Sequence, residues 1–119
     1  MYTVRIESGF AAAHFLTNYH GKCENVHGHN YKVRVYVRGT ELDSAGMLVD
    51  FGIMKRHLKT VMEKLDHHDL NAVPEFRNSP SAERIAEYIF NALCCESGDI
   101  RWTAVEVFET DANMARFEP

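Results

Sequence analysis

The sequence is poor in cysteine and in long apolar runs. Its three cysteines include one adjacent pair, Cys94 and Cys95, which makes a poor disulfide framework. We therefore expect a reducing, cytoplasmic setting in which Cys23 remains a usable thiol. No apolar run approaches the ~20 residues that a membrane span needs, and the N-terminus lacks a signal-peptide pattern. These shortages argue against a disulfide-stapled secreted domain and against a membrane protein.

An excess of positive charge is also missing. The net charge is −4 and the pI is near 5.9, so electrostatics give no reason to expect a nucleic acid or an anionic membrane as partner. Hydrophobic residues make up 45% of the 119 residues. A chain of this size buries about two-thirds of its unfolded surface, so we expect one domain over residues 1–119.

Four stretches alternate between apolar and polar residues, which is the period of a half-buried β-strand. They cover residues 2–13, 29–38, 102–109 and 114–118. The first two are joined by a loop at residues 15–26, and neighbouring strands joined in this way should pair antiparallel.

Two stretches instead repeat apolar residues every three or four positions, which predicts amphipathic helices. One begins after Asp50, a suitable N-cap; the other begins near Pro80 and ends at Gly98, and residues 66–78 between them are predicted as a loop. The two apolar faces consist of Phe51, Met54, Leu58, Val61, Met62 and Leu65, and of Ile85, Ala86, Ile89, Phe90 and Leu93. The order of two strands, two helices and two strands predicts an α+β fold with a four-stranded antiparallel sheet and both helices on one face.

A cluster of metal-binding residue types lies at the start of the second strand. Cys23, His27 and His29 fall within seven positions. Residues two apart in a strand lie on the same face, so His27 and His29 could grip one metal ion, and antiparallel pairing would bring His14 near them. Three histidines leave an open position, as in catalytic zinc sites, whereas Cys23 as a fourth ligand would close a structural site. Each histidine could also be an ordinary surface or core residue.

Three further groups have both a functional and a structural interpretation. Asp66 beside His67 could set the imidazole tautomer for a proton relay, or the pair could simply favour a helix end and a turn. Glu109 could bind a ligand, or be a solvated carboxylate at a strand end. Ser81 and Ala82 lie in a stretch that is most simply the start of a helix.

Several stretches together resemble the 6-pyruvoyl-tetrahydropterin synthase and 6-carboxy-tetrahydropterin synthase family. They are 10–14, 23–31, 46–51, 65–67 with 70–71, 80–83 and 109–110, in order across nearly the whole chain. The resemblance implies the tunnelling fold, in which ββααββ subunits join edge to edge into stacked rings. It further implies a homo-hexamer, a dimer of trimers, with sites at subunit interfaces.

The resemblance also implies roles for individual residues. His14, His27 and His29 would bind Zn²⁺, and Cys23 would be the general base with Asp66 and His67 as its proton-relay partners. Glu109 would hold the pterin ring by a paired, charge-assisted contact, with further contacts from Ser81 and Ala82. Family members often have Pro-Thr where this chain has Pro80-Ser81, and serine keeps the hydroxyl.

The implied reaction is that of a zinc-dependent 6-carboxy-5,6,7,8-tetrahydropterin synthase. It would convert 7,8-dihydroneopterin triphosphate with release of triphosphate and acetaldehyde, in queuosine-type deazapurine synthesis. A 6-pyruvoyl-tetrahydropterin synthase is the first alternative. Glu24, directly after Cys23, resembles the base of a folate-branch variant that forms 6-hydroxymethyl-dihydropterin, which would make the chain bifunctional; Glu24 could equally be a solvated loop residue. An alternative of another class is a non-enzymatic, zinc-stapled binding domain.

Overall fold

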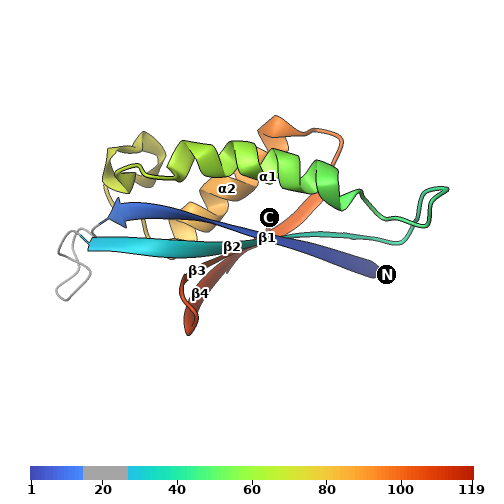
Figure 1. Ribbon diagram of the computed structural model, residues 1–119, viewed down its shortest axis with the longest axis horizontal. Helices are drawn as coiled ribbons and strands as arrows, with labels where there is room; N and C mark the ends of the chain where they lie inside the picture. The colour runs from blue at the N-terminus through green and yellow to red at the C-terminus, as the bar shows by residue number, and fades with distance from the viewer. Residues whose placement is uncertain (15–26) are drawn as a thin grey trace.

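The computed structural model describes residues 1–14 and 27–119, and the side chains of His14 and His27 lie outside the described part. The elements are β1 (Tyr2–His14), β2 (His27–Gly39), α1 (Phe51–Leu65), the 3₁₀ helices η2 (Leu70–Ala72) and η3 (Pro74–Phe76), α2 (Ala82–Glu96), β3 (Trp102–Thr110) and β4 (Asn113–Phe117). The strands form one antiparallel sheet in the order β1-β2-β3-β4. Both helices lie on one face of this sheet, which confirms the predicted α+β fold (Figure 1).

The core lies between the helices and the sheet. Its fully buried side chains alternate along the strands, as at Val33 and Val35, and recur on one face of each helix, as at Leu58 and Ile89. Burial of such an aliphatic side chain stabilises the fold by about 1.5–3 kcal/mol. The alternation and the helical period that predicted these elements therefore describe the two surfaces that pack together. In the described part of the chain neither helix is long and apolar enough to cross a lipid bilayer.

The helix ends have definite local causes. The Asp50 carboxylate accepts the amide of Gly52, so the predicted N-cap of α1 is confirmed. For α2 the capping residue is Ser81 rather than a residue at Pro80, because the Ser81 hydroxyl accepts the amide of Arg84. The predicted loop at 66–78 is wrong in part, since η2 and η3 lie within it.

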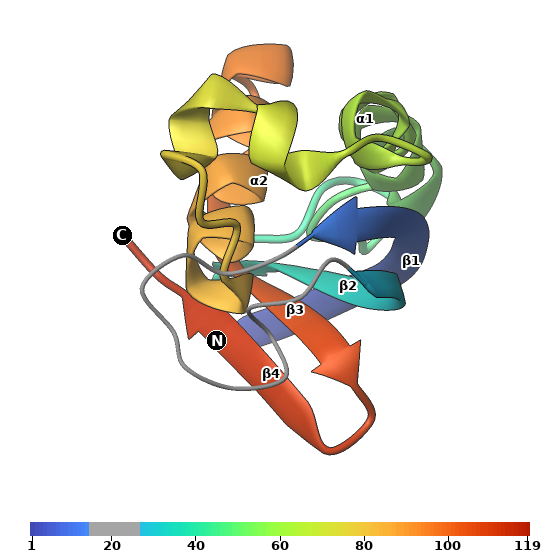
Figure 2. The ribbon, with the colours of Figure 1, turned by 90° about the vertical axis from the view of Figure 1, so that its left-hand side faces the viewer.

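The antiparallel order places four strand ends at one end of the molecule. β1 ends there, β2 begins there, β3 ends there and β4 begins there. Figure 2 looks onto this end and shows the segment between α1 and α2 above the ends of β1 and β2. All described candidate site residues come from these strand ends, from this segment and from the first residue of α2.

Candidate functional site

The register of β1 and β2 places the three histidines at neighbouring backbone positions. His14 is the direct register partner of His27, and Ala12 is the partner of His29. Residues directly opposite in an antiparallel pair have Cα atoms about 4.5–5.5 Å apart. The expected approach of His14 to His27 and His29 is therefore present in the backbone.

His29 makes a direct contact with Glu109, at the end of β3. Nε2 of His29 lies 3.0 Å from Oε1 of Glu109, with side chains that are 20% and 26% exposed. The chain thus joins one of its predicted metal ligands to its predicted pterin-binding carboxylate. Sequence reasoning treated the two residues separately. Neither strand's sequence indicates which residue of β3 lies next to His29 at the start of β2.

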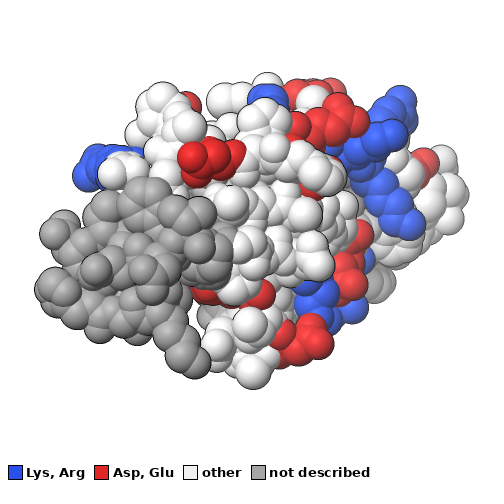
Figure 3. Space-filling view, turned by 60° about the vertical axis from the view of Figure 1, so that its left-hand side comes forward, with Lys and Arg blue, Asp and Glu red and all other residues white. Residues whose placement is uncertain are grey.

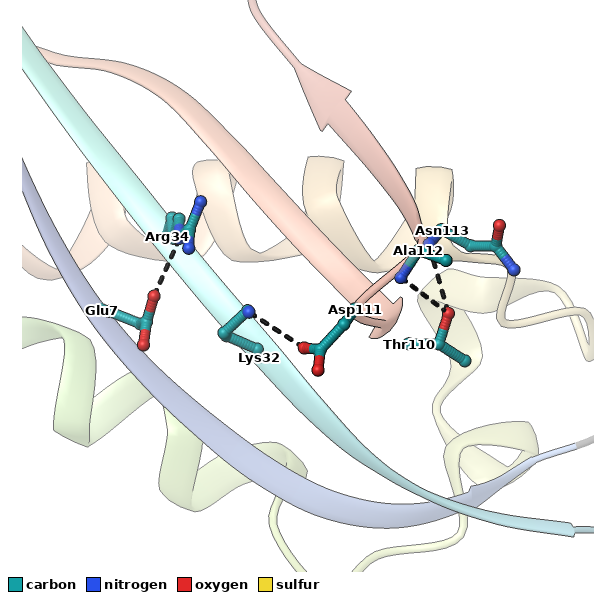
Figure 4. A network of polar contacts seen from close by, with 7 residues as sticks. All are labelled: Glu7, Lys32, Arg34, Thr110, Asp111, Ala112 and Asn113. Atoms are coloured by element: carbon teal, nitrogen blue, oxygen red, sulfur yellow. Dashed lines mark hydrogen bonds and ion pairs between the residues drawn. The ribbon is translucent and has the colours of Figure 1, made fainter.

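The turn after Glu109 is fixed by polar contacts, drawn in Figure 4. The Thr110 hydroxyl accepts the backbone amides of Ala112 and Asn113 over 3.2 Å each, which closes the turn between β3 and β4. Nζ of Lys32, on the neighbouring strand β2, lies 3.1 Å from the Asp111 carboxylate. These contacts hold the end of β3, and so the position from which Glu109 extends.

Asp66 and His67 lie against the end of β1. The Ala11 amide donates to Oδ1 of Asp66 over 2.9 Å, and the His67 amide donates to the Ala11 carbonyl over 2.6 Å. The other Asp66 oxygen is 3.0 Å from Nδ1 of His67. The hydrogen bond from Ala11, followed by that from His67, holds the pKa of the Asp66 carboxyl below its ordinary value.

Two hollows are lined by four of the described site residues, His29, His67, Ala82 and Glu109. One, of about 470 Å³, is formed by Ala11–Ala13, Gly28–Asn30 and His67–Asp69. The other, of about 380 Å³, is lined by Glu109, by Ala82 and Glu83 at the start of α2, and by residues 113–116 of β4. His29 lines the first hollow and Glu109 the second, so the contact between these two residues shows that the hollows are neighbours.

The charges on one face of the molecule are mixed. Figure 3 shows blue and red side chains next to one another along the right-hand side of the face, rather than a patch of one sign. Single-sign patches are typical of sites that attract polyanions by long-range electrostatics. The charged side chains on the right-hand side of this view form no such patch.

Several predicted site residues lie outside the described part of the chain. Cys23 and Glu24 fall in residues 15–26, and the side chains of His14 and His27 are not described. Among the remaining side chains no group of three His, Cys, Asp or Glu residues is arranged so that it could hold a metal ion. The backbone positions of the three histidines nevertheless fit a zinc ion, because His14 and His27 are direct partners and His29 is two residues further along the same strand.

Sequence reasoning missed Arg84, whereas it placed Asn71 in a resembling stretch and expected it to form turn hydrogen bonds. Arg84 stands in the first turn of α2, where the helix dipole does not favour a cation. Its Nη1 donates to the carbonyls of Phe76 and Ser79, at 2.8 and 3.2 Å. Asn71 donates to the carbonyl of Asn78 over 3.0 Å.

The four-stranded sheet with two helices on one face defines the class of fold, and comparisons with known proteins show the family. The model of the 6-pyruvoyl tetrahydropterin synthase family matches residues 3–119. The chain belongs to this family.

Individual relatives carry two kinds of name. A Synechocystis protein named 6-carboxy-5,6,7,8-tetrahydropterin synthase is 38% identical over 122 residues, which cover 98% of this chain and 93% of the relative. A Dictyostelium discoideum protein named 6-pyruvoyl tetrahydrobiopterin synthase is 36% identical over 80% of this chain and 72% of its own length. The solved structure of Caenorhabditis elegans 6-pyruvoyl tetrahydropterin synthase superposes with a TM-score of 0.87 at 29% identity, covering 99% of this chain and 95% of that one.

Proposed function

We propose that this protein is a zinc-dependent 6-carboxy-5,6,7,8-tetrahydropterin synthase acting on 7,8-dihydroneopterin triphosphate. The observation that carries the proposal is the contact between His29 and Glu109, at 3.0 Å. It brings a candidate metal-binding histidine beside a carboxylate suited to a pterin ring. A single bound pterin substrate could therefore reach both the metal and the carboxylate. The Synechocystis relative with the 6-carboxy name, which matches nearly the whole chain, favours this product.

Each group in the site has a chemical task in this proposal. Glu109 accepts hydrogen bonds from the amino group and the ring N–H of the pterin, which fixes the ring. Asp66, held by the Ala11 amide, orients the imidazole of His67 through Nδ1. Cys23 removes protons from the substrate side chain as a thiolate.

Zinc would be held by His14, His27 and His29. When bound, it would supply Lewis acidity and a template for the hydroxyl groups of the substrate side chain. The protein's own contribution is the strand register, which sets the three histidines at neighbouring positions before any metal arrives.

The site is proposed to be completed by a second copy of the chain in a ring. The outer edge of β1 is covered at Ala11 and Ala13 by residues 66–69. In the described part of the chain no strand pairs with the outer edge of the earlier residues of β1 or with the outer edge of β4. Rotation about an axis along the strands would pair β4 antiparallel with β1 of the next copy. The start of β4, which lines the Glu109 pocket, would then lie beside the neighbouring copy's residues 66–69.

The exposure of His67 supports this arrangement. Its side chain is 82% exposed, although a proton-relay group in a finished site is normally enclosed. A neighbouring copy would supply the missing wall. With the number of copies taken from the resemblance to the family, we propose a homo-hexamer, as a dimer of trimers, with each site shared between subunits.

The product assay tests the proposal. Purified protein loaded with zinc is incubated with 7,8-dihydroneopterin triphosphate, and products are identified by mass. We expect 6-carboxy-5,6,7,8-tetrahydropterin with acetaldehyde and triphosphate, a product that would serve queuosine-type deazapurine synthesis. A 6-pyruvoyl product would instead support the second candidate, which the name of the Dictyostelium relative favours. Absence of any pterin product would overturn the enzyme proposal in favour of a zinc-stapled binding domain.

A further inference from the structure

The turn that leads into α2 has an unfavourable backbone conformation. Arg77 and Asn78 are consecutive and both have positive φ, 51° and 59°. Residues with a Cβ avoid this left-handed region, asparagine less than arginine. Two such residues in succession persist only where surrounding contacts hold them.

Two side chains hold this turn from different elements. Nη1 of Arg84, on α2, donates to the carbonyls of Phe76 and Ser79, which flank the strained pair. Nδ2 of Asn71, in η2, donates to the carbonyl of Asn78 over 3.0 Å and to its side-chain oxygen over 3.1 Å. The turn is thus tied to the helix that follows it and to the segment that follows His67.

The turn decides where the pocket wall at the start of α2 stands. Ser81 caps the helix directly after it, and Ala82 and Glu83 line the pocket that contains Glu109. A shift of the turn would move this wall relative to Glu109, which is fixed independently by β3.

We propose that Arg84 is a positioning residue for the pterin pocket. By holding the carbonyls of Phe76 and Ser79, its guanidinium sets the distance between the start of α2 and Glu109. This inference rests on the proposed pterin-binding function. Arg84 itself lines a different hollow of about 510 Å³, together with Lys64 and Arg77, so it acts on the pocket through the turn.

The experiment measures binding of neopterin to the zinc-loaded protein by fluorescence titration. Arg84→Met removes both hydrogen bonds, and we expect the Kd for neopterin to rise about tenfold, since small displacements of a pocket wall are costly. Arg84→Lys keeps a cation and donors on a similar stem and should recover most of the affinity. Lys64→Met, which removes a cation from the same outer hollow without touching the turn, should bind as the wild type does.

A purely structural role gives a different result. If Arg84→Met lowers the Tm while its folded fraction binds neopterin with wild-type Kd, the positioning role is overturned. Equal Kd values for the Met and Lys variants, both raised, would overturn the hydrogen-bond explanation. If the wild type itself fails to bind neopterin, the result contradicts the proposed pterin-binding function, and the positioning role of Arg84, which rests on that function, is overturned as well. Unchanged zinc content in all variants separates the effect from metal loss.

Discussion

The amide of Ala11 donates to Oδ1 of Asp66 across 55 residues of sequence, at a distance of 2.9 Å. The neighbouring His67 amide returns a hydrogen bond to the Ala11 carbonyl. One residue at the end of β1 therefore has both of its backbone groups satisfied by the candidate proton-relay pair. The same two residues that are candidates for the proton relay therefore also stabilise the end of β1.

Replacing Asp66 should change how stability depends on pH. A carboxyl whose pKa is lowered on folding stabilises the protein above its unfolded pKa, near 3.9, and this stabilisation is lost as pH falls through the folded value. Asp66→Asn keeps an oxygen acceptor but no charge. We expect it to be less stable than the wild type at pH 7, with a difference that shrinks at pH 3, in urea unfolding. Asp99→Asn, at an exposed position, is the control; an equal deficit at both pH values would contradict the explanation.

Glu109→Gln should weaken pterin binding without removing zinc. Glutamine keeps one acceptor but places an NH₂ against the pterin donors, and loss of a charge-assisted pair costs roughly 1.5–3 kcal/mol. The Kd for neopterin should rise about 10- to 100-fold. Glu83→Gln changes a carboxylate in the same pocket and serves as the matched control. A Kd that rises equally in both variants would indicate a general charge effect.

The metal assignment predicts that replacing His27 removes zinc, whereas replacing Cys23 does not. His27→Ala should lose zinc and activity together, because two histidines hold the ion poorly, whereas His57→Ala on α1 should keep both. Cys23→Ala should keep stoichiometric zinc and the fold but lose turnover. Metal analysis by mass spectrometry measures these outcomes. Zinc retained in His27→Ala would sink the ligand assignment, and zinc lost in Cys23→Ala would favour a closed structural site.

Most helices and strands were predicted from the sequence because each is long enough to repeat its hydrophobic period several times. The helical repeat from Phe51 to Leu65 gave α1 with its bounds, and strand alternation gave β2. Residues 66–78 carry no comparable period, since η2 and η3 have three residues each, and a single turn of 3₁₀ helix has no amphipathic repeat. That segment was therefore predicted as a loop.

The candidate site was only partly predictable for a related reason. Placing His14 beside His27 needed only the pairing of adjacent strands, which the structure confirms. The contact between His29 and Glu109 depends on β3 lying next to β2 in a particular register, and alternation alone does not fix a register. Tertiary packing decides such contacts.

The adjacent residues Cys23 and Glu24 predict a division of products. An unperturbed thiol has a pKa near 8.5 and an unperturbed carboxyl one near 4.3, so the two kinds of group suit different proton abstractions. Cys23→Ala should abolish the 6-carboxy product and leave some 6-hydroxymethyl product; Glu24→Ala should do the reverse. Product analysis by mass measures both. If Glu24→Ala changes neither product and the wild type forms no hydroxymethylpterin, the chain has a single activity.

Shared sites predict that two inactive variants can restore each other. His67→Ala and Glu109→Gln each disable one side of the site, and each variant alone should be nearly inactive. If His67 acts on the pocket of a neighbouring copy, subunits mixed at equal amounts by unfolding and refolding will form some sites that receive both intact residues. Random assembly makes about one site in four intact, because each of the two contributing subunits is suitable half of the time.

The control for this experiment is simple mixing of the two assembled variants without refolding. It should stay inactive, because no subunits exchange. Sedimentation of the refolded mixture must show an oligomer, and a stable monomer at micromolar concentration would count decisively against the ring. If the refolded oligomer shows no activity above that of the two variants, His67 and Glu109 of the same chain serve the same site, because then every site in the mixture carries one defect.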